Sequence, residues 1–520
     1  HPAPGYPYGA PQSQLPGQPP VYAQPAVMAP PSMPAQQPFS AQPQVAAQQP
    51  FSAQQPPSPV PFQTGVAAQA VDGATLTEVE SEPSRLDAPE EPAAAPPLAK
   101  KKKTAPDGIV LTDYLHGFYE AEACDKPDCE CEACKKKCGA GGGADDAKYP
   151  SIVATGFFQV DALWFAQDAA NRAAVGDAQD TTDFRRARMA FKGDVAENVS
   201  YMIEMDFAFP GRPSFMDVFL DVGDLPWGHV RVGQWRQPFG MDALTSVRDL
   251  TFFERALPFA LVPFRQVGVG AYNTILDERA TWAASVYRFP TDVFGDVTGD
   301  SGYGFATRWT ALLFADDETN ENLHVGLDYT INNPSTDLTR IRSAPEVGFN
   351  QLDYSTTFFS VPFFVDTGFV PTNTYQVIGA ELAQSWGPLI LQSELYYAML
   401  SEFQGPNVTF PGMYAQASYV LTGEHRNYNR NAGAFGRAIP DQNFGANGWG
   451  AWEVAARWSY LDLTDANVLG GDLNDLTIGL NWYLNRFTKF QFNYMRAMLN
   501  TPGIGRSEAD VVGVRAQLDF

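Results

Sequence analysis

The sequence predicts an all-β chain, a sixteen-stranded antiparallel transmembrane β-barrel preceded by a long, mostly disordered Pro/Gln-rich N-terminal extension. Three observations support this prediction. After about residue 150, apolar and polar residues alternate with a period of two. No segment approaches the roughly 18–20 consecutive apolar residues of a membrane-spanning helix. Residues 1–71 contain no Asp, Glu, Lys or Arg and are rich in Pro and Gln.

The alternation recurs in segments of about ten residues that Gly, Asn, Asp and Pro separate, which is typical of a barrel with an apolar outer face and a polar interior. In residues 201–207 the odd positions are apolar, whereas Glu204 and Asp206 lie between them. Sixteen strands over residues 151–520 leave about 23 residues for each strand and its connection, which suits short turns at one end and long loops at the other. A soluble β-sandwich has turns every 8–12 residues, so the wider spacing favours a barrel.

The charge excludes one class of partner. The chain has 35 Lys and Arg against 59 Asp and Glu, a net charge of −24, whereas a nucleic-acid-binding protein needs a basic face. The chain starts HPAPGYPYG, with neither an initiator Met nor an apolar signal core, so we expect a mature product whose signal peptide has been cleaved.

We expect three regions. Residues 1–99 form the disordered extension, because Pro and Gln without aliphatic clusters bury too little surface to offset chain entropy. Residues 100–148 form a junction with a run of four lysines, a short helix within 109–123 and a Cys-rich segment, and residues 149–520 form the barrel. The extension is either a simple spacer or a tether that crosses the periplasm or binds the cell wall.

All cysteines lie within the junction: Cys124, Cys129, Cys131, Cys134 and Cys138. An oxidising periplasm favours disulfides, and the odd count suggests one bond between chains. Thiolates this close together are also able to bind Zn²⁺ tetrahedrally. Disulfide formation, metal binding and no function therefore remain as alternatives.

One predicted strand carries the most informative charges. Arg186, Arg188 and Lys192 share one parity with Phe184, whereas the opposite parity is mostly apolar apart from Arg185. Alternation therefore predicts that Arg186, Arg188 and Lys192 line the lumen. It also predicts that Arg185 faces outward near a membrane interface. Residues on the same face of a strand are about 6.6–6.8 Å apart, so an anion could pass from one cation to the next.

The following strand offers a second interpretation of these charges. Glu204 and Asp206 have the inward parity, so they could pair with the basic residues across the sheet and stiffen the wall. The sequence leaves an anion ladder and structural pairing open.

Four blocks carry a family resemblance: residues 184–193 (FRRARMAFKG), residues 231–270, residues 421–428 (LTGEHRNY) and the ending that closes with VRAQLDF. They resemble the phosphate-selective porin family (porins O and P), over a region from about residue 149 to the last residue. The resemblance implies a sixteen-stranded outer-membrane barrel without a cofactor, usually trimeric, that passes phosphate or related anions. It also implies that residues 240–268 fold into the barrel as a constriction loop. The charges expected to set selectivity there are Arg248, Asp249, Glu254, Arg255 and Arg265.

The chain departs from the best-known members of that family in its basic residues. Residues 151–520 contain 25 Lys and Arg against 42 Asp and Glu, a net charge of −17, and the lysines among them are only Lys192 and Lys489. Arginine stays charged and binds phosphate through two nitrogens, so it can replace lysine at a recognition site. The negative domain, however, does not attract anions from a distance.

These observations predict a bacterial outer-membrane porin, a passive channel for small solutes that prefers phosphate-like anions. The alternative is a weakly selective general porin that is mainly an abundant envelope protein tethered by its extension. A barrel enzyme is disfavoured, because no histidine lies near a nucleophile in a matching motif. The expected partners of the barrel are two further copies in a homotrimer and outer-membrane lipid. The extension is expected in the periplasm or at the cell surface, where its partner would be the cell wall or another envelope component.

Overall fold

The computed structural model describes residues 149–520 except 209–211, 293, 298, 348–360 and 446–447. The expected extension (1–99), the junction (100–148) with its helix, and the five cysteines lie outside these residues. Among the described residues, no helix is both long enough and apolar enough to cross a membrane.

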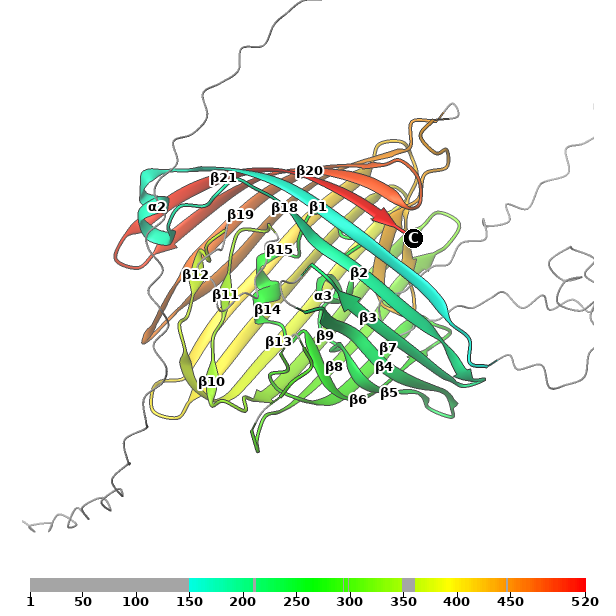
Figure 1. Ribbon diagram of the computed structural model, residues 1–520, viewed down its shortest axis with the longest axis horizontal. Coiled ribbons are helices and arrows are strands. Elements are labelled where there is room, and N and C mark those ends of the chain that lie inside the picture. The colour runs from blue at the N-terminus through cyan, green and yellow to red at the C-terminus, as the bar shows by residue number, and fades with distance from the viewer. Residues whose placement is uncertain (1–148, 209–211, 293, 298, 348–360, 446–447) are drawn as a thin grey trace, which may run out of the picture. The chain divides into compact units, whose positions relative to one another are not determined.

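Sixteen strands of the described region form a closed antiparallel barrel, as the sequence predicts (Figure 1). The ring closes because β1 pairs with β2 on one side and with β21 on the other. All other neighbours follow chain order, with two exceptions. β9 pairs with β13 because β10 to β12 lie in the connection between them, and β15 pairs with β18 because β16 and β17 lie in theirs. The strands of the ring are β1 (Val153–Gln167), β2 (Thr181–Ala196), β3 (Val199–Asp206), β4 (Ser214–Leu225), β5 (Gly228–Arg236), β6 (Arg265–Ile275), β7 (Ala280–Arg288), β8 (Tyr303–Asp316), β9 (Glu321–Asn333), β13 (Val370–Trp386), β14 (Leu389–Glu402), β15 (Val408–Val420), β18 (Ala451–Asp465), β19 (Val468–Tyr483), β20 (Thr488–Thr501) and β21 (Gly505–Asp519).

The remaining elements are short and lie in the connections. They are α2 (Ala169–Val175), α3 (Met241–Leu244), the 3-10 helix η1 (Leu257–Leu261), β10 (Leu338–Thr339), β11 (Arg342–Ser343), β12 (Val365–Asp366), β16 (Arg426–Asn429) and β17 (Ala434–Ala438). β11 pairs with β12, and β16 pairs with β17. Because the ring has an even number of antiparallel strands, the start of β1 and the end of β21 lie at the same rim.

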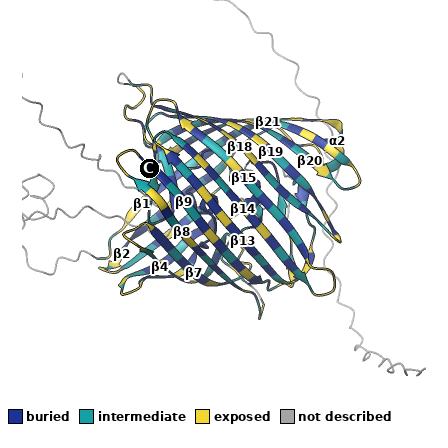
Figure 2. Cartoon of the chain, turned by 180° about the vertical axis from the view of Figure 1, so that it is seen from behind, coloured by how far each residue is buried: buried dark blue, intermediate teal, exposed yellow. Residues whose placement is uncertain are grey.

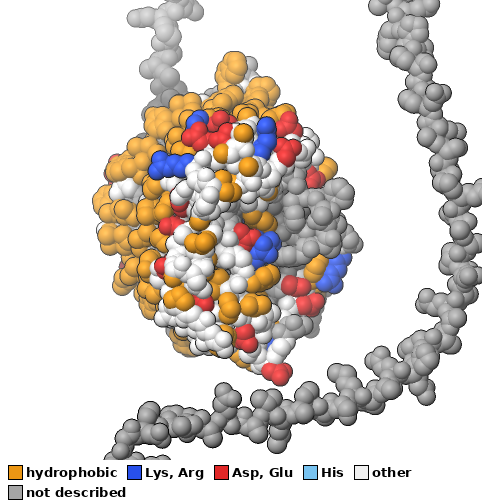
Figure 3. Space-filling view, turned by 90° about the vertical axis from the view of Figure 1, so that its left-hand side faces the viewer, with side chains coloured by type: hydrophobic (Ala, Val, Ile, Leu, Met, Phe, Trp, Pro, Cys, Tyr) orange, Lys and Arg blue, Asp and Glu red, His pale blue; other side chains and the backbone are white. Residues whose placement is uncertain are grey.

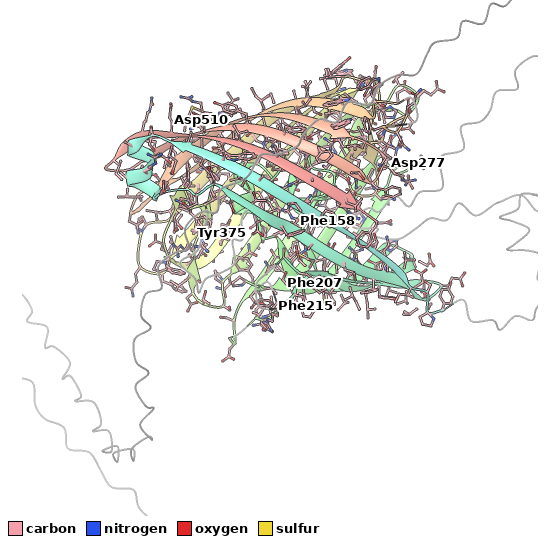
Figure 4. All side chains as sticks on the ribbon, turned by 45° about the horizontal axis from the view of Figure 1, so that its top comes forward. Phe158, Phe207, Phe215, Asp277, Tyr375 and Asp510 are labelled. Atoms are coloured by element: carbon pink, nitrogen blue, oxygen red, sulfur yellow. The ribbon has the colours of Figure 1, made fainter. Side chains whose placement is uncertain are left out.

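The strands alternate between two environments, as the period-two pattern requires (Figure 2). In β13, Ile378 and Leu382 are 48% and 53% exposed on the outer face, whereas Glu381 on the inner face is 4% exposed. Phe207 and Phe215, at the end of β3 and the start of β4, are likewise exposed (Figure 4). The outer face is therefore the apolar surface and the inner face carries the polar side chains.

The two rims differ in the length of their connections. The rim at which β1 begins has short turns, with the exception of residues 421–450, which contain β16 and β17. The opposite rim carries α2 and two long connections, residues 237–264 and 334–369. Figure 3 looks toward the α2 end, where charged side chains gather beside the hydrophobic outer surface.

The last residue helps to close the ring. The backbone amides and carbonyls of Gly156 and Phe520 exchange two hydrogen bonds of 2.9 Å, and Thr155 Oγ1 donates to the Phe520 carbonyl at 2.7 Å. The Phe520 ring covers Gly156, where a Cβ atom would lie 2.6 Å from Phe520 Cζ and 2.5 Å from the Arg188 carbonyl oxygen. A side chain at position 156 would therefore displace the ring or the neighbouring strand.

Gly156→Val should weaken this closure. We expect the folded barrel to lose about 1–3 kcal/mol, the usual cost of overpacking, because the new side chain collides with Phe520 and with β2. The measurement is the temperature at which the compact barrel band converts to the unfolded band in SDS gels. Ala162→Val, which adds bulk to an outward position of the same strand, is the control. Equal conversion temperatures in both variants would contradict the proposed clash.

Candidate functional site

Residues 237–264, the connection between β5 and β6, lie inside the barrel, where α3 is visible behind β2 and β3 in Figure 1. Their backbone carbonyls accept hydrogen bonds from side chains of the surrounding wall. The carbonyl acceptors and their wall donors are Val247 with Gln159 at 3.1 Å, Arg248 with Gln517 at 3.1 Å, Thr251 with Asn481 at 2.8 Å, Phe253 with Arg515 at 2.5 Å, Glu254 with Arg457 at 2.9 Å and Leu261 with Tyr375 at 2.5 Å. The donors come from β1, β13, β18, β19 and β21, so the segment crosses the lumen from β5. We refer to residues 237–264 as the lumen loop.

Aromatic side chains anchor the lumen loop in sockets at wall glycines. Phe252 and Phe253 are 1% and 0% exposed. A Cβ atom at Gly479 would lie 3.1 Å from Phe252 Cε1, and one at Gly513 would lie 2.4 Å from Phe253 Cε2. The absence of a side chain at these two positions therefore lets the rings lie directly on the strands β19 and β21.

Several arginines converge on Glu254 of the lumen loop. Its carboxylate accepts hydrogen bonds from Arg186 Nη2 at 2.6 Å, Arg185 Nε at 3.0 Å and Arg515 Nη2 at 3.0 Å. Burial raises the pKa of the Glu254 carboxyl, but these guanidiniums outweigh burial and hold the pKa well below its ordinary value. Glu254 therefore stays ionised, and its contribution to loop attachment is lost only in acid below the ordinary range of a carboxyl group.

A β-bulge in β2 explains why Arg185 contacts Glu254. It also shows that the predicted inward orientation of Phe184 is wrong. Gln159 of β1 pairs with Arg186, but the next residue, Val160, pairs with Phe184, so Arg185 is the extra residue. Phe184 consequently faces outward and is 54% exposed, and Arg185 reaches Glu254 inside the barrel. The expected position of Arg185 at a membrane interface is wrong.

The other predicted wall residues are buried inside the barrel and largely paired. Arg188 Nε donates to Asp206 at 2.8 Å, and Arg188 Nη1 lies 3.6 Å from Glu204. Asp206 lies directly opposite Arg188 in the register of β2 and β3. Lys192 is 2% exposed. Of the two interpretations that the sequence leaves open, this geometry favours cross-strand pairing for Arg188, whereas Arg186 turns to the lumen loop.

The charged residues predicted for the loop have different positions. Arg248 and Arg255 are buried; Arg255 donates to the Asp242 carbonyl at 2.8 Å, and burial together with the neighbouring Arg236 lowers the pKa of Arg255. Asp249 accepts a hydrogen bond from Arg437 Nε at 2.7 Å.

Arg265 corrects the predicted boundary of the loop. It is the first residue of β6, and its guanidinium Nε donates to Asp217 of β4 at 2.9 Å. The loop therefore ends before residue 265, because this residue already has the backbone pairing of a strand, opposite Arg236. Arg265 belongs to the barrel wall.

Two further segments enter the lumen, and sequence reasoning assigned neither of them to it. In residues 334–369, the Glu346 carboxylate pairs with Arg457 and accepts hydrogen bonds from Ser459 and from Thr477, the latter at 2.9 Å. From the opposite rim, Arg426 of β16 donates to the Asp249 carbonyl at 2.6 Å. The only sequence signal for the second segment is its length at a rim that otherwise has short turns.

Three buried carboxylates, those of Asp328, Glu381 and Glu394, lie close enough together to be considered as metal ligands. The Glu394 carboxylate, however, already accepts hydrogen bonds from the amides of Met241 and Asp242 and from the hydroxyls of Tyr396 and Tyr414. Glu381 forms a two-pronged pair with Arg308, both contacts being 2.7 Å. Glu394 therefore holds the start of α3 against the wall, and hydrogen bonds already occupy the Glu381 and Glu394 oxygens that a metal ion would need.

Gly513→Val should loosen the lumen loop. The new side chain would occupy the position of the Phe253 ring, so we expect the loop to leave its socket and single-channel conductance in planar bilayers to rise. The double variant Gly513→Ala/Phe253→Leu restores space for the ring position. Its conductance should be closer to that of the wild type than the conductance of Gly513→Ala alone. Val512→Leu, an outward change one residue earlier, is the control; equal conductance in Gly513→Val and in this control would show that Phe253 does not anchor the loop.

Comparison with known proteins places this architecture among porins. The chain is 27% identical over 380 residues to Porin O of Pseudomonas aeruginosa, which covers 66% of this chain and 83% of that protein. It is also 27% identical over 358 residues to an uncharacterised protein of Caulobacter vibrioides, with 65% and 68% of the two chains covered.

Among solved structures, the chain is similar to an anion-selective porin from Comamonas acidovorans, with 13% identity, a TM-score of 0.45 and coverage of 71% of this chain and 99% of that one. The model of the family "phosphate-selective porin O and P" matches residues 158–520, which include every strand of the ring and the lumen loop, although β1 begins five residues before the match. The chain therefore belongs to the phosphate-selective porin O and P family.

Proposed function

We propose that this outer-membrane porin passes small solutes by passive diffusion and prefers phosphate-like anions. The observation that carries the proposal is the convergence of Arg185, Arg186 and Arg515 on the lumen loop at Glu254. Guanidinium groups bind the oxygens of phosphate and carboxylate through two parallel hydrogen bonds. A cluster of them beside the segment that crosses the lumen supports recognition of oxyanions there.

Local charge outweighs net charge inside such a pore. The negative barrel does not steer anions from bulk solution, but at physiological salt charges act over only about 8–10 Å. An anion beside the lumen loop therefore responds mainly to the nearest guanidiniums. The description of the family, phosphate-selective porin O and P, points in the same direction.

The rival proposal is a weakly selective general porin that serves mainly as an envelope protein. It is favoured by the pairing of lumen arginines with carboxylates, as in Arg188 with Asp206 and Arg308 with Glu381. Paired cations present little net charge to a passing ion. Family and fold point to a channel and not to an enzyme.

We also propose a homotrimer in the outer membrane, with the rim at which β1 begins in the periplasm. Strand length supports the assembly. β3, β5 and β7 have 8, 9 and 9 residues, whereas β13 has 17. A tilted strand needs about 9–11 residues to span the hydrocarbon layer, so the short-strand side of the wall is better covered by protein than by lipid.

Arg185→Gln should reduce anion preference. In a salt gradient across a planar bilayer, we expect the wild type to show an anion-selective reversal potential, and the variant to lose about a factor of two in the anion-to-cation permeability ratio, because one unit charge is removed beside the pathway. Arg506→Gln, which removes the same charge from an exposed position at the start of β21, should match the wild type. A wild type without anion selectivity would favour the general porin.

The assembly is testable by mass. Protein extracted in mild detergent should have three times the mass of one chain in native mass spectrometry, because exposed apolar surface on the short-strand side needs a partner. A species with the mass of one chain under the same gentle conditions would show that the trimer is wrong.

A further inference from the structure

We propose that the Glu254 carboxylate is an internal occupant of an oxyanion site formed by Arg185, Arg186 and Arg515, which phosphate must displace. The inference rests on the proposed anion preference and deepens it, because it names the residue that sets which anions are bound. Glu254 belongs to the lumen loop, whereas the three arginines belong to the wall strands β2 and β21.

The donor set is that of an oxyanion site. Glu254 Oε1 accepts hydrogen bonds from Arg185 Nε at 3.0 Å, Arg186 Nη1 at 3.1 Å and Arg515 Nη2 at 3.0 Å. Oε2 accepts from Arg185 Nη2 at 3.2 Å and Arg186 Nη2 at 2.6 Å. Arg185 and Arg186 thus each bind both oxygens, which is the two-pronged geometry with which guanidinium groups hold carboxylate or phosphate.

Positive charge exceeds negative charge at this point. The only other carboxylate that pairs with these arginines among the described residues is Asp161, which takes both contacts of 2.6 Å from Arg515. Three guanidiniums therefore face two carboxylates. Arg186 Nε is also buried and donates no hydrogen bond within the described part of the chain. An anion with more oxygens and more charge than one carboxylate would satisfy this site better.

Glu254 can leave the site without movement of the loop backbone. Its side chain is 14% exposed and that of Arg185 is 18% exposed, so water reaches this edge of the cluster. The backbone on either side has separate attachments, since Arg515 Nη1 donates to the Phe253 carbonyl and Arg457 Nη2 to the Glu254 carbonyl. A rotation of the Glu254 side chain is therefore sufficient to vacate the arginines.

An internal carboxylate raises the intrinsic affinity that an anion needs in order to occupy the arginines. Phosphate offers several oxygens in the geometry that two guanidinium groups recognise, whereas chloride offers a single atom and cannot form paired contacts. Glu254 lowers the apparent affinity of every anion by the same factor, because each must bind the fraction of sites that the carboxylate has vacated. Chloride, without paired contacts, then binds too weakly to occupy the site, whereas phosphate still binds but is not held too tightly to leave.

The test measures block of chloride current by inorganic phosphate through the full-length protein in planar bilayers. Glu254→Gln should lower the half-blocking phosphate concentration by about tenfold or more, because charge-assisted hydrogen bonds freed from Glu254 become available to phosphate. Glu254→Asp keeps the charge but withdraws the oxygens by one methylene, and it should shift the value in the same direction. Glu278→Gln is the matched control, since it makes the same substitution and removes the same charge at an exposed turn between β6 and β7; it should shift the value by about twofold or less.

The outcomes separate this inference from the proposed function. If Glu254→Gln shifts the half-blocking concentration no more than Glu278→Gln in an anion-selective wild type, the internal occupant is disproved and anion preference stands. If the wild type itself is not anion-selective, the proposed function fails first. If Glu254→Gln does not fold into a heat-modifiable barrel, Glu254→Asp decides, and a value equal to the wild type would overturn the inference.

Discussion

The hydrogen bonds from wall side chains to the backbone carbonyls of the lumen loop are the contacts on which the interior depends. A segment without regular structure leaves its carbonyls unpaired, and inside a barrel those groups must find donors. Asn481, Arg457 and Arg515 supply them from three strands of the facing wall. Because the donors sit on a rigid sheet, the loop has one defined path across the lumen.

The same wall must also accommodate its own charges. A buried guanidinium without a partner costs several kcal/mol, so nearly every inward arginine described above lies beside a carboxylate. The partners differ in origin: Asp206 pairs with Arg188 from the next strand, whereas Glu254 and Glu346 reach Arg186 and Arg457 from inserted segments. The carboxylates of the inserted segments therefore both hold those segments in the lumen and neutralise arginines of the wall.

The sequence predicts the barrel well because strand side chains alternate strictly, and alternation is visible locally. The inward positions of Glu204 and Asp206 follow from it. The predicted inward orientation of Phe184 is wrong, because a bulge adds one residue to the strand. Nothing in the local sequence FRRAR distinguishes a bulge from a regular strand.

The interior is less predictable because its contacts join distant parts of the chain. The length of the lumen loop marks it as more than a turn, but the predicted upper boundary, residue 268, lies within β6, which already begins at Arg265. Glu346 and Arg457 lie 111 residues apart, and Asp249 and Arg437 lie 188 apart, so no local pattern reveals either pair. The choice between an anion ladder and structural pairing likewise depends on contacts between separate segments, which no local pattern shows.

The glycine sockets under Phe252 and Phe253 tie together positions that are more than two hundred residues apart. A larger residue at Gly479 or Gly513 is compatible with the fold only if the ring above it becomes smaller. Across the descendants of one ancestral barrel, these positions are therefore constrained to change in pairs. A glycine in the wall should occur with a bulky ring in the loop, and a larger wall residue with a smaller loop side chain. The evolutionary record of such chains should retain the path of the loop through the lumen even where the identities of its charged residues have drifted.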